Sequence, residues 1–182
     1  MPDQLSLVAH RNYRVARPSR FGALLLITVM AGFGCDRNET SRVEPSYDQA
    51  TGRLKLLQYD ANGDGSIDTW SYMDGVRVVR IELDGDQDSR IDRWEYYGPD
   101  QQINKVEIAT KRDGKADRFE YYEAGTLARA EMDTNGDGQI DKWEVYDGSR
   151  LASVAFDTTQ RGAADRRIVY GPDGSARLER IP

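Results

Sequence analysis

The sequence has few of the residues from which many catalytic and metal sites are built. Its 182 residues include one Cys and one His, so neither an intrachain disulfide nor a His- or Cys-rich metal site can form. It contains no G-x-S-x-G nucleophile motif and no glycine-rich phosphate loop. Lys and Arg total 25 against 31 Asp and Glu, and the net charge of −6 argues against a nucleic-acid partner. We therefore expect a protein that is not an enzyme.

The sequence also lacks an apolar run long enough for a membrane-spanning helix, which needs about twenty residues. The apolar stretch at residues 21–33 has thirteen residues, and it follows several Arg residues, as in a signal peptide. It ends next to the only Cys. Gly32-Phe33-Gly34-Cys35 resembles a bacterial lipobox, although Gly32 stands where Leu is usual. The resemblance implies cleavage before Cys35 and a lipid on the Cys35 thiol.

These features divide the chain into three parts. Residues 1–34 are expected to be a lipoprotein signal peptide, helical or disordered, and residues 35–50 the lipidated Cys and a polar, flexible tether. Residues 51–182 form a repeat domain. The expected location is the bacterial cell envelope, with the lipid on Cys35 as the membrane anchor. Asp36 after the Cys fits retention at the inner membrane, but that rule is not universal, so the choice between inner and outer membrane stays open.

The repeat domain is built from a unit of about 24 residues. An Asp recurs at intervals of 24, 25, 24 and 24 residues, and an aromatic residue follows it by two positions in four of the five copies. These residues are Asp68, Asp92, Asp117, Asp141 and Asp165, followed by Trp70, Trp94, Phe119, Trp143 and, in the fifth copy, Arg167. A final half copy occupies residues 175–182.

Each unit contains an acidic loop and two short alternating segments separated by a tight turn. Alternation of apolar and polar residues predicts strands, and Asp-Gly turns such as Asp74-Gly75 predict hairpins. We therefore predict an all-β fold, an antiparallel meander or solenoid of about five hairpin repeats with calcium loops between the hairpins. One face is expected to carry the Trp, Phe and Tyr side chains, and the other Arg, Glu and Lys facing water.

The acidic loops contain the candidate metal ligands of this sequence. Residues 133–144, DTNGDGQIDKWE, match the EF-hand calcium-loop pattern at every defined position. Calcium takes six to eight oxygen ligands, and several carboxylates packed into nine residues repel one another without a cation. Magnesium suits such loops less, because it keeps its waters and demands octahedral geometry.

Three loops have the composition of a calcium site, so about three Ca²⁺ ions are expected. The first offers Asp60, Asn62, Asp64, Asp68 and the carbonyl group of Ser66. The second offers Asp84, Asp86, Asp88, Asp92, Glu95 and the carbonyl group of Arg90. The third offers Asp133, Asn135, Asp137, Asp141, Glu144 and the carbonyl group of Gln139. Position six of each loop needs a left-handed backbone, which glycine adopts easily. Gly65 and Gly138 occupy this position in the first and third loops, and Ser89 occupies it in the second.

Two further loops have lost ligands. Loop 109–117 has Ala109 and Lys111 at positions one and three, and loop 157–165 has Arg161 at position five. Our hypothesis is that the Lys or Arg replaces the charge of the missing ion. Asp is nevertheless retained at position nine of both loops, so position nine is expected to have a structural role as well. The same argument applies to the Glu at position twelve.

The loops resemble those of EF-hand and dockerin proteins and the DxNxDGxxD runs of thrombospondin type-3 repeats. The hairpins, as in Tyr170-Gly171-Pro172-Asp173-Gly174, resemble bacterial YD or MORN-like repeats. The resemblance implies a calcium-binding, non-enzymatic repeat module. Our first hypothesis is that this module has a structural or protein-interaction role in the envelope, with an envelope protein of unknown identity as candidate partner.

Two alternatives stay open. One is a dockerin-like or EF-hand-like module that docks to a cell-surface partner when calcium is bound; the other is a set of solvated acidic turns that bind nothing. A helix-loop-helix unit does not fit, because a period of 24 residues leaves twelve for two helices and a connector.

Overall fold

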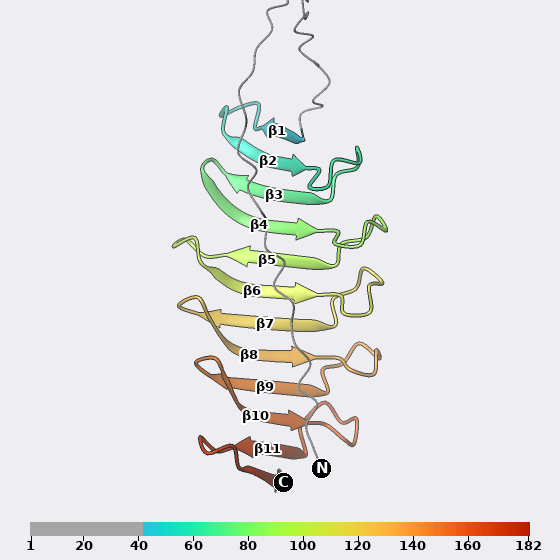
Figure 1. The fold of residues 1–182 in the computed structure, drawn as a ribbon, viewed down its shortest axis with the longest axis vertical. Helices are drawn as coiled ribbons and strands as arrows, with labels where there is room; N and C mark the ends of the chain where they lie inside the picture. Colours follow the sequence, from blue (N-terminus) through green and yellow to red (C-terminus); the bar gives the residue numbers. More distant parts are fainter. Residues whose placement is uncertain (1–41) are drawn as a thin grey trace, which may run out of the picture. The chain divides into compact units, whose positions relative to one another are not determined.

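The computed structural model describes residues 42–182, and these residues form one open antiparallel β-sheet of twelve strands (Figure 1). The signal peptide and Cys35 lie outside the described residues. The strands are β1 Val43–Tyr47, β2 Leu54–Tyr59, β3 Thr69–Asp74, β4 Arg77–Leu83, β5 Arg93–Tyr97, β6 Ile103–Ile108, β7 Arg118–Glu123, β8 Thr126–Met132, β9 Lys142–Asp147, β10 Arg150–Phe156, β11 Arg166–Tyr170 and β12 Ala176–Arg180. No helix long and apolar enough to cross a bilayer occurs in this part of the chain.

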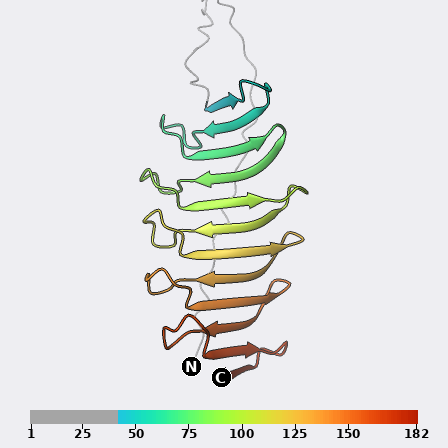
Figure 2. The same cartoon turned by 180° about the vertical axis from the view of Figure 1, so that it is seen from behind.

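The strands follow one another in the sheet in the order of the sequence, from β1 at one edge to β12 at the other. Tight hairpin turns line one side of the sheet and the longer acidic loops line the other, as both views show (Figures 1 and 2). The prediction of an all-β antiparallel meander of hairpin repeats is confirmed. A dockerin arrangement needs a helix after each loop, whereas each acidic loop here leads into a strand.

The sheet begins earlier than the sequence predicts. Residues 43–47 lie in the segment that the sequence predicts to be a flexible tether, yet they form β1 and pair with β2 from Val43↔Tyr59 to Tyr47↔Leu54. The segment Val-Glu-Pro-Ser-Tyr alternates apolar and polar residues, but Pro45 in its middle argues against a strand in the interior of a sheet. An edge strand tolerates this composition, because only one of its sides has to pair.

The division of side chains between the two faces differs from the prediction. Trp70 lies opposite Glu82 and Tyr72 lies opposite Arg80, and directly opposed residues of an antiparallel pair share one face. The same alternation of rings and charges continues along the sheet. We name this the aromatic face, defined by Trp70, Trp94, Phe119 and Trp143.

The charged side chains of the aromatic face lie against the rings. The Arg80 guanidinium is centred 4.2 Å from the Tyr72 ring, and the Arg129 guanidinium 3.6 Å from the Tyr121 ring. Tyr72 Oη donates a hydrogen bond of 2.9 Å to Glu82. Charged heads and apolar stems of the even-numbered strands therefore cover the rings of the odd-numbered strands, and neither face is purely aromatic or purely charged.

The opposite side, the aliphatic face, is defined by Ile81, Val106, Ala130 and Val154. Each of these lies between residues of the neighbouring strands, and Val106 lies between Glu95 and Glu120. Val106 is completely buried and Ala130 is 1 % exposed, although no second layer of structure covers the sheet within residues 42–182. Long charged side chains from the flanking strands supply the cover.

Candidate metal centre

Five loops lie along one side of the sheet, at residues 60–68, 84–92, 109–117, 133–141 and 157–165 (Figure 1). Backbone hydrogen bonds connect each loop to the next. The amide at position one donates to the carbonyl at position nine of the preceding loop, as from Asp84 to Asp68 at 2.9 Å and from Asp133 to Asp117 at 2.9 Å. The five loops therefore form a continuous row.

The Asp at position one organises its loop from within. Asp133 is 9 % exposed, and its two carboxylate oxygens accept the amides of Gly136 at 2.6 Å and Gly138 at 2.7 Å. Burial alone would raise the pKa of Asp133, but these amides and the charge of Lys111 outweigh it and hold the pKa below its ordinary value. Asp60 and Asp84 accept the equivalent amides in their loops.

Positions four and six have a left-handed backbone in every loop. At position six, φ is 94° at Gly65, 70° at Ser89 and 87° at Gly138. This confirms the expectation for position six and shows that Ser89 adopts a conformation that favours glycine. The backbone at position four is left-handed as well. This was not predicted, although Gly63 and Gly136 at position four indicate it.

The Asp at position nine closes its loop. Its carboxylate accepts the amide of position two in all five loops, for example from Ala61 to Asp68 at 2.9 Å and from Gly85 to Asp92 at 2.9 Å. The ligand-poor loops keep the same bond, at 2.8 Å from Thr110 to Asp117 and at 2.8 Å from Thr158 to Asp165. The structural role expected for position nine is present in the structure, and it explains why Asp persists there.

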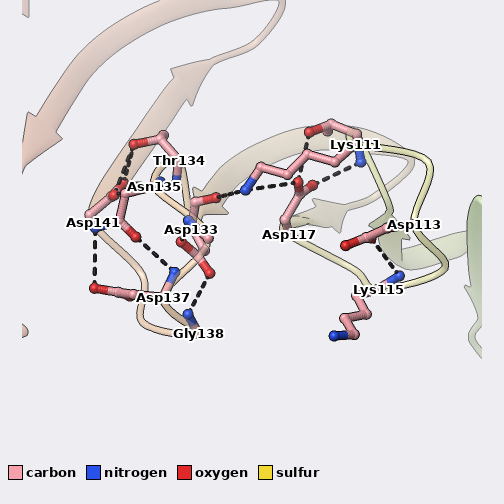
Figure 3. A network of polar contacts seen from close by, with 12 residues as sticks. Lys111, Asp113, Lys115, Asp117, Asp133, Thr134, Asn135, Asp137, Gly138 and Asp141 are labelled. Atoms are coloured by element: carbon pink, nitrogen blue, oxygen red, sulfur yellow. Dashed lines mark hydrogen bonds and ion pairs between the residues drawn. The ribbon is translucent and has the colours of Figure 1, made fainter.

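Positions three and five lie side by side at the exposed tip of the loop. In loop 60–68, Asn62 Nδ2 donates to Asp64 Oδ2 at 3.0 Å, and this bond is the main cause that lowers the pKa of Asp64. Asn135 and Asp137 make the same contact at 3.1 Å in loop 133–141 (Figure 3). The amide of position seven donates to the Asp at position five, from Ser66, Arg90 and Gln139.

Loop 84–92 brings together three carboxylates. Ligand oxygens of Asp84, Asp86 and Asp88 all lie within 4.8 Å of one another. In addition, Asp92 Oδ1 is buried and has no hydrogen-bond partner within the described chain. The corresponding oxygens of Asp117 and Asp141 accept a Thr hydroxyl, which Gly85 at position two cannot offer. Three converging carboxylates, and a buried, unpaired carboxylate oxygen in the same loop, fit a hard cation such as Ca²⁺.

The Glu residues at position twelve have other partners. Glu144 is 7 % exposed on the aliphatic face, where Lys142 lies 2.7 Å away, Arg118 3.0 Å away and Tyr146 Oη donates at 2.9 Å. Glu95 is engaged by Arg93 at 2.7 Å and by Tyr97 at 2.8 Å. These contacts belong to the sheet, so Glu95 and Glu144 stay predictions as calcium ligands.

The EF-hand family profile matches residues 56–69 and 130–145, which contain loops 60–68 and 133–141. The sequence has no match among curated proteins. One similar solved structure is the crystal structure of accessory secretory protein 1, 2 and 3 in Streptococcus pneumoniae, with 18% identity and a TM-score of 0.38. Another is the crystal structure of the GtfA/B complex bound to UDP and GlcNAc, with 12% identity and a TM-score of 0.26.

The matched regions cover 66% of this chain and 20% of the first protein, and 76% of this chain and 24% of the second. At these TM-scores the likeness carries no argument about function. The two EF-hand matches, together with the carboxylate cluster of loop 84–92, support EF-hand-like calcium loops.

Proposed function

We propose that this protein binds calcium in loops 60–68, 84–92 and 133–141, and that the ions stabilise a repeat sheet with a structural or protein-interaction role. The observation that carries the proposal is the group of Asp84, Asp86 and Asp88 carboxylates, in the same loop as the unpaired Asp92 Oδ1. The EF-hand matches on the other two loops support it independently.

Calcium would supply positive charge where several carboxylates converge. Asp84, Asp86 and Asp88, with Asp92, would hold the ion in loop 84–92. Asp60, Asn62 and Asp64 would hold it in loop 60–68, and Asp133, Asn135 and Asp137 in loop 133–141. Because each loop joins two adjacent strands and bonds to its neighbouring loop, ion binding would stabilise the strand pairs on both sides.

The cellular setting is a proposal from the sequence. The lipobox-like Gly32-Phe33-Gly34-Cys35 supports a lipid on Cys35 and a position in the bacterial envelope. The scarcity of His and Cys and the lack of nucleophile and phosphate-loop motifs support a role other than catalysis. An envelope protein is the proposed partner.

The direct test is calorimetric titration of the purified full chain with calcium after treatment with a chelator. We expect three ions per chain and a melting temperature that is higher in calcium than in chelator. Asp84→Asn combined with Asp88→Asn should remove one ion. Asp113→Asn, in ligand-poor loop 109–117, is the matched control and should leave three. Absence of heat, together with identical melting curves in calcium and chelator, would refute the proposal.

A further inference from the structure

Two cationic side chains that are adjacent in loop 109–117 extend to different neighbouring loops. Lys111 reaches the loop that follows, 133–141, and Arg112 reaches the loop that precedes, 84–92. Both neighbours are acidic loops with a predicted calcium site. The third cation of the same loop, Lys115, forms no side-chain hydrogen bond or ion pair with residues 42–182 (Figure 3).

The Lys111 ammonium lies between oxygens of two loops. Its Nζ is 3.6 Å from Asp117 Oδ2, at position nine of its own loop, and 3.5 Å from the backbone carbonyl of Asp133 (Figure 3). It also packs close to Gly136, where a Cβ atom would lie 3.0 Å from Nζ. The Asp117 side chain is 8 % exposed, so the ammonium compensates a carboxylate that is largely removed from water.

The Arg112 guanidinium contacts the carboxylate cluster of loop 84–92. Its Nη1 lies 3.4 Å from Asp86 Oδ2, and Asp86 is one of the three carboxylates that converge there. A calcium ion bound through Asp86 has to compete with this guanidinium for the same oxygen. The contact is exposed, so the competition is modest in strength.

The backbone of loop 109–117 is the same as that of the calcium-type loops. Arg112 at position four has φ of 54°, and Gly114 at position six has φ of 76°. The amide of Thr110 also donates to Asp117, as at position two of the other loops. This loop therefore keeps the conformation without the ligands of positions one and three, and a lysine stands in place of one of them.

We propose that loop 109–117 is a cationic spacer in the row of loops. Lys111 provides, as a tethered ammonium, the positive charge that calcium provides in the acidic loops. Arg112 compensates loop 84–92 in the absence of calcium and lowers its calcium affinity. The affinity part of this inference rests on the proposed function. Arg161 in loop 157–165 is not a second example, because the ion pair to Asp165 of that loop comes from Arg166, and Arg161 forms none within the described residues.

The test compares Lys111→Met, Arg112→Met and Lys115→Met in the full chain. Lys115→Met removes the same charge from the same loop without removing a contact, so it is the matched control. In chelator, Lys111→Met should lower the melting temperature by about 2–4 °C, whereas Lys115→Met should leave it unchanged. In calcium titrations, Arg112→Met should tighten one of the sites about two- to fivefold.

A double substitution assigns that site. In a background with Asp86→Asn, the gain in affinity from Arg112→Met should disappear, because the oxygen that Arg112 contacts is no longer charged. Equal effects of the Lys111, Arg112 and Lys115 variants would overturn the proposal. If the full chain bound no calcium, the proposed function would fail and the affinity part would fail with it. The melting comparison of Lys111→Met with Lys115→Met in chelator would still decide the role of Lys111.

Discussion

Arg118 joins two carboxylates across three strands of the aliphatic face. Its Nε donates to Glu120 at 2.8 Å, and its Nη1 lies 3.0 Å from Glu144. Ala130 stands directly between these two Glu residues in the register of the sheet, so the guanidinium that joins them lies over Ala130. A small residue under a long cation explains how an Ala in a single-layer sheet becomes buried.

The charge of Glu144 is expected to stabilise the fold. Glu144→Gln keeps the shape of the side chain but weakens its bonds with Lys142 and Arg118, and should reduce the free energy of unfolding by about 1.5–3 kcal/mol. Urea denaturation in chelator measures the loss. Glu123→Gln, at the exposed end of β7, should change it by less than about 0.5 kcal/mol. An equal loss in both variants would contradict the role assigned to Glu144.

The same residue predicts a dependence on pH. Burial alone would raise the pKa of Glu144, but hydrogen bonds from Lys142 and Tyr146 and the charge of Arg118 lower it below its ordinary 4.5. A carboxyl whose folded pKa is lowered stabilises the fold above its unfolded pKa, and this contribution is lost as the pH falls through the folded pKa. In chelator, stability should therefore fall below about pH 4.5, and less steeply in Glu144→Gln.

The hairpin and its acidic loop form the unit that the sequence predicts best. Spacing of Asp and aromatic residues located the loops and strands, because a repeated loop needs the same residues at the same places. Pairing between strands was harder to foresee. The alternation of Trp70 and Tyr72 with polar neighbours describes one strand, but Glu82 and Arg80 join the same face only through the register of β3 with β4.

The sequence predicts which residues belong to the candidate site, but it predicts less well which contacts each residue makes. Asp60 and Asp133 at position one were identified as ligands, and the structure adds that both also cap the loop amides. The contacts of Glu95 and Glu144 come from cations two residues away and across the sheet. Arg93 occupies a position that the twelve-residue loop pattern leaves undefined, and Arg118 lies outside the loop, so the pattern predicts neither partner.

A new calcium loop can be built from loop 109–117. Asp113 and Asp117 already occupy positions five and nine, and the backbone is already left-handed at positions four and six. Ala109→Asp combined with Lys111→Asp should therefore raise the number of calcium ions per chain by one in calorimetric titration. Ala109→Asp alone keeps the lysine and should leave the number unchanged. An unchanged number in the double variant would contradict the assignment of positions one and three.

The two edges of the sheet are protected from pairing with another sheet. Pro45 stands in the middle of β1, where it removes a backbone donor, and exposed Arg177 and Arg180 lie on β12. Pro45→Val restores the donor and adds a β-branched side chain, so it should produce a weak dimer that depends on concentration. Sedimentation velocity measures it. Pro99→Val, in the turn between β5 and β6, is the control and should stay monomeric at the same concentrations.

In the described sheet, every strand pairs through its backbone only with the strands next to it in the sequence. A force applied between β1 and β12 therefore acts on every strand pair in series. Under tension such a sheet should unfold first at its least stable strand pair, while the other strand pairs stay folded. Calcium ions bound in the loops along one side of the sheet would strengthen the connections between neighbouring strands. The calcium concentration around the chain would then determine how many strands unfold under a given force.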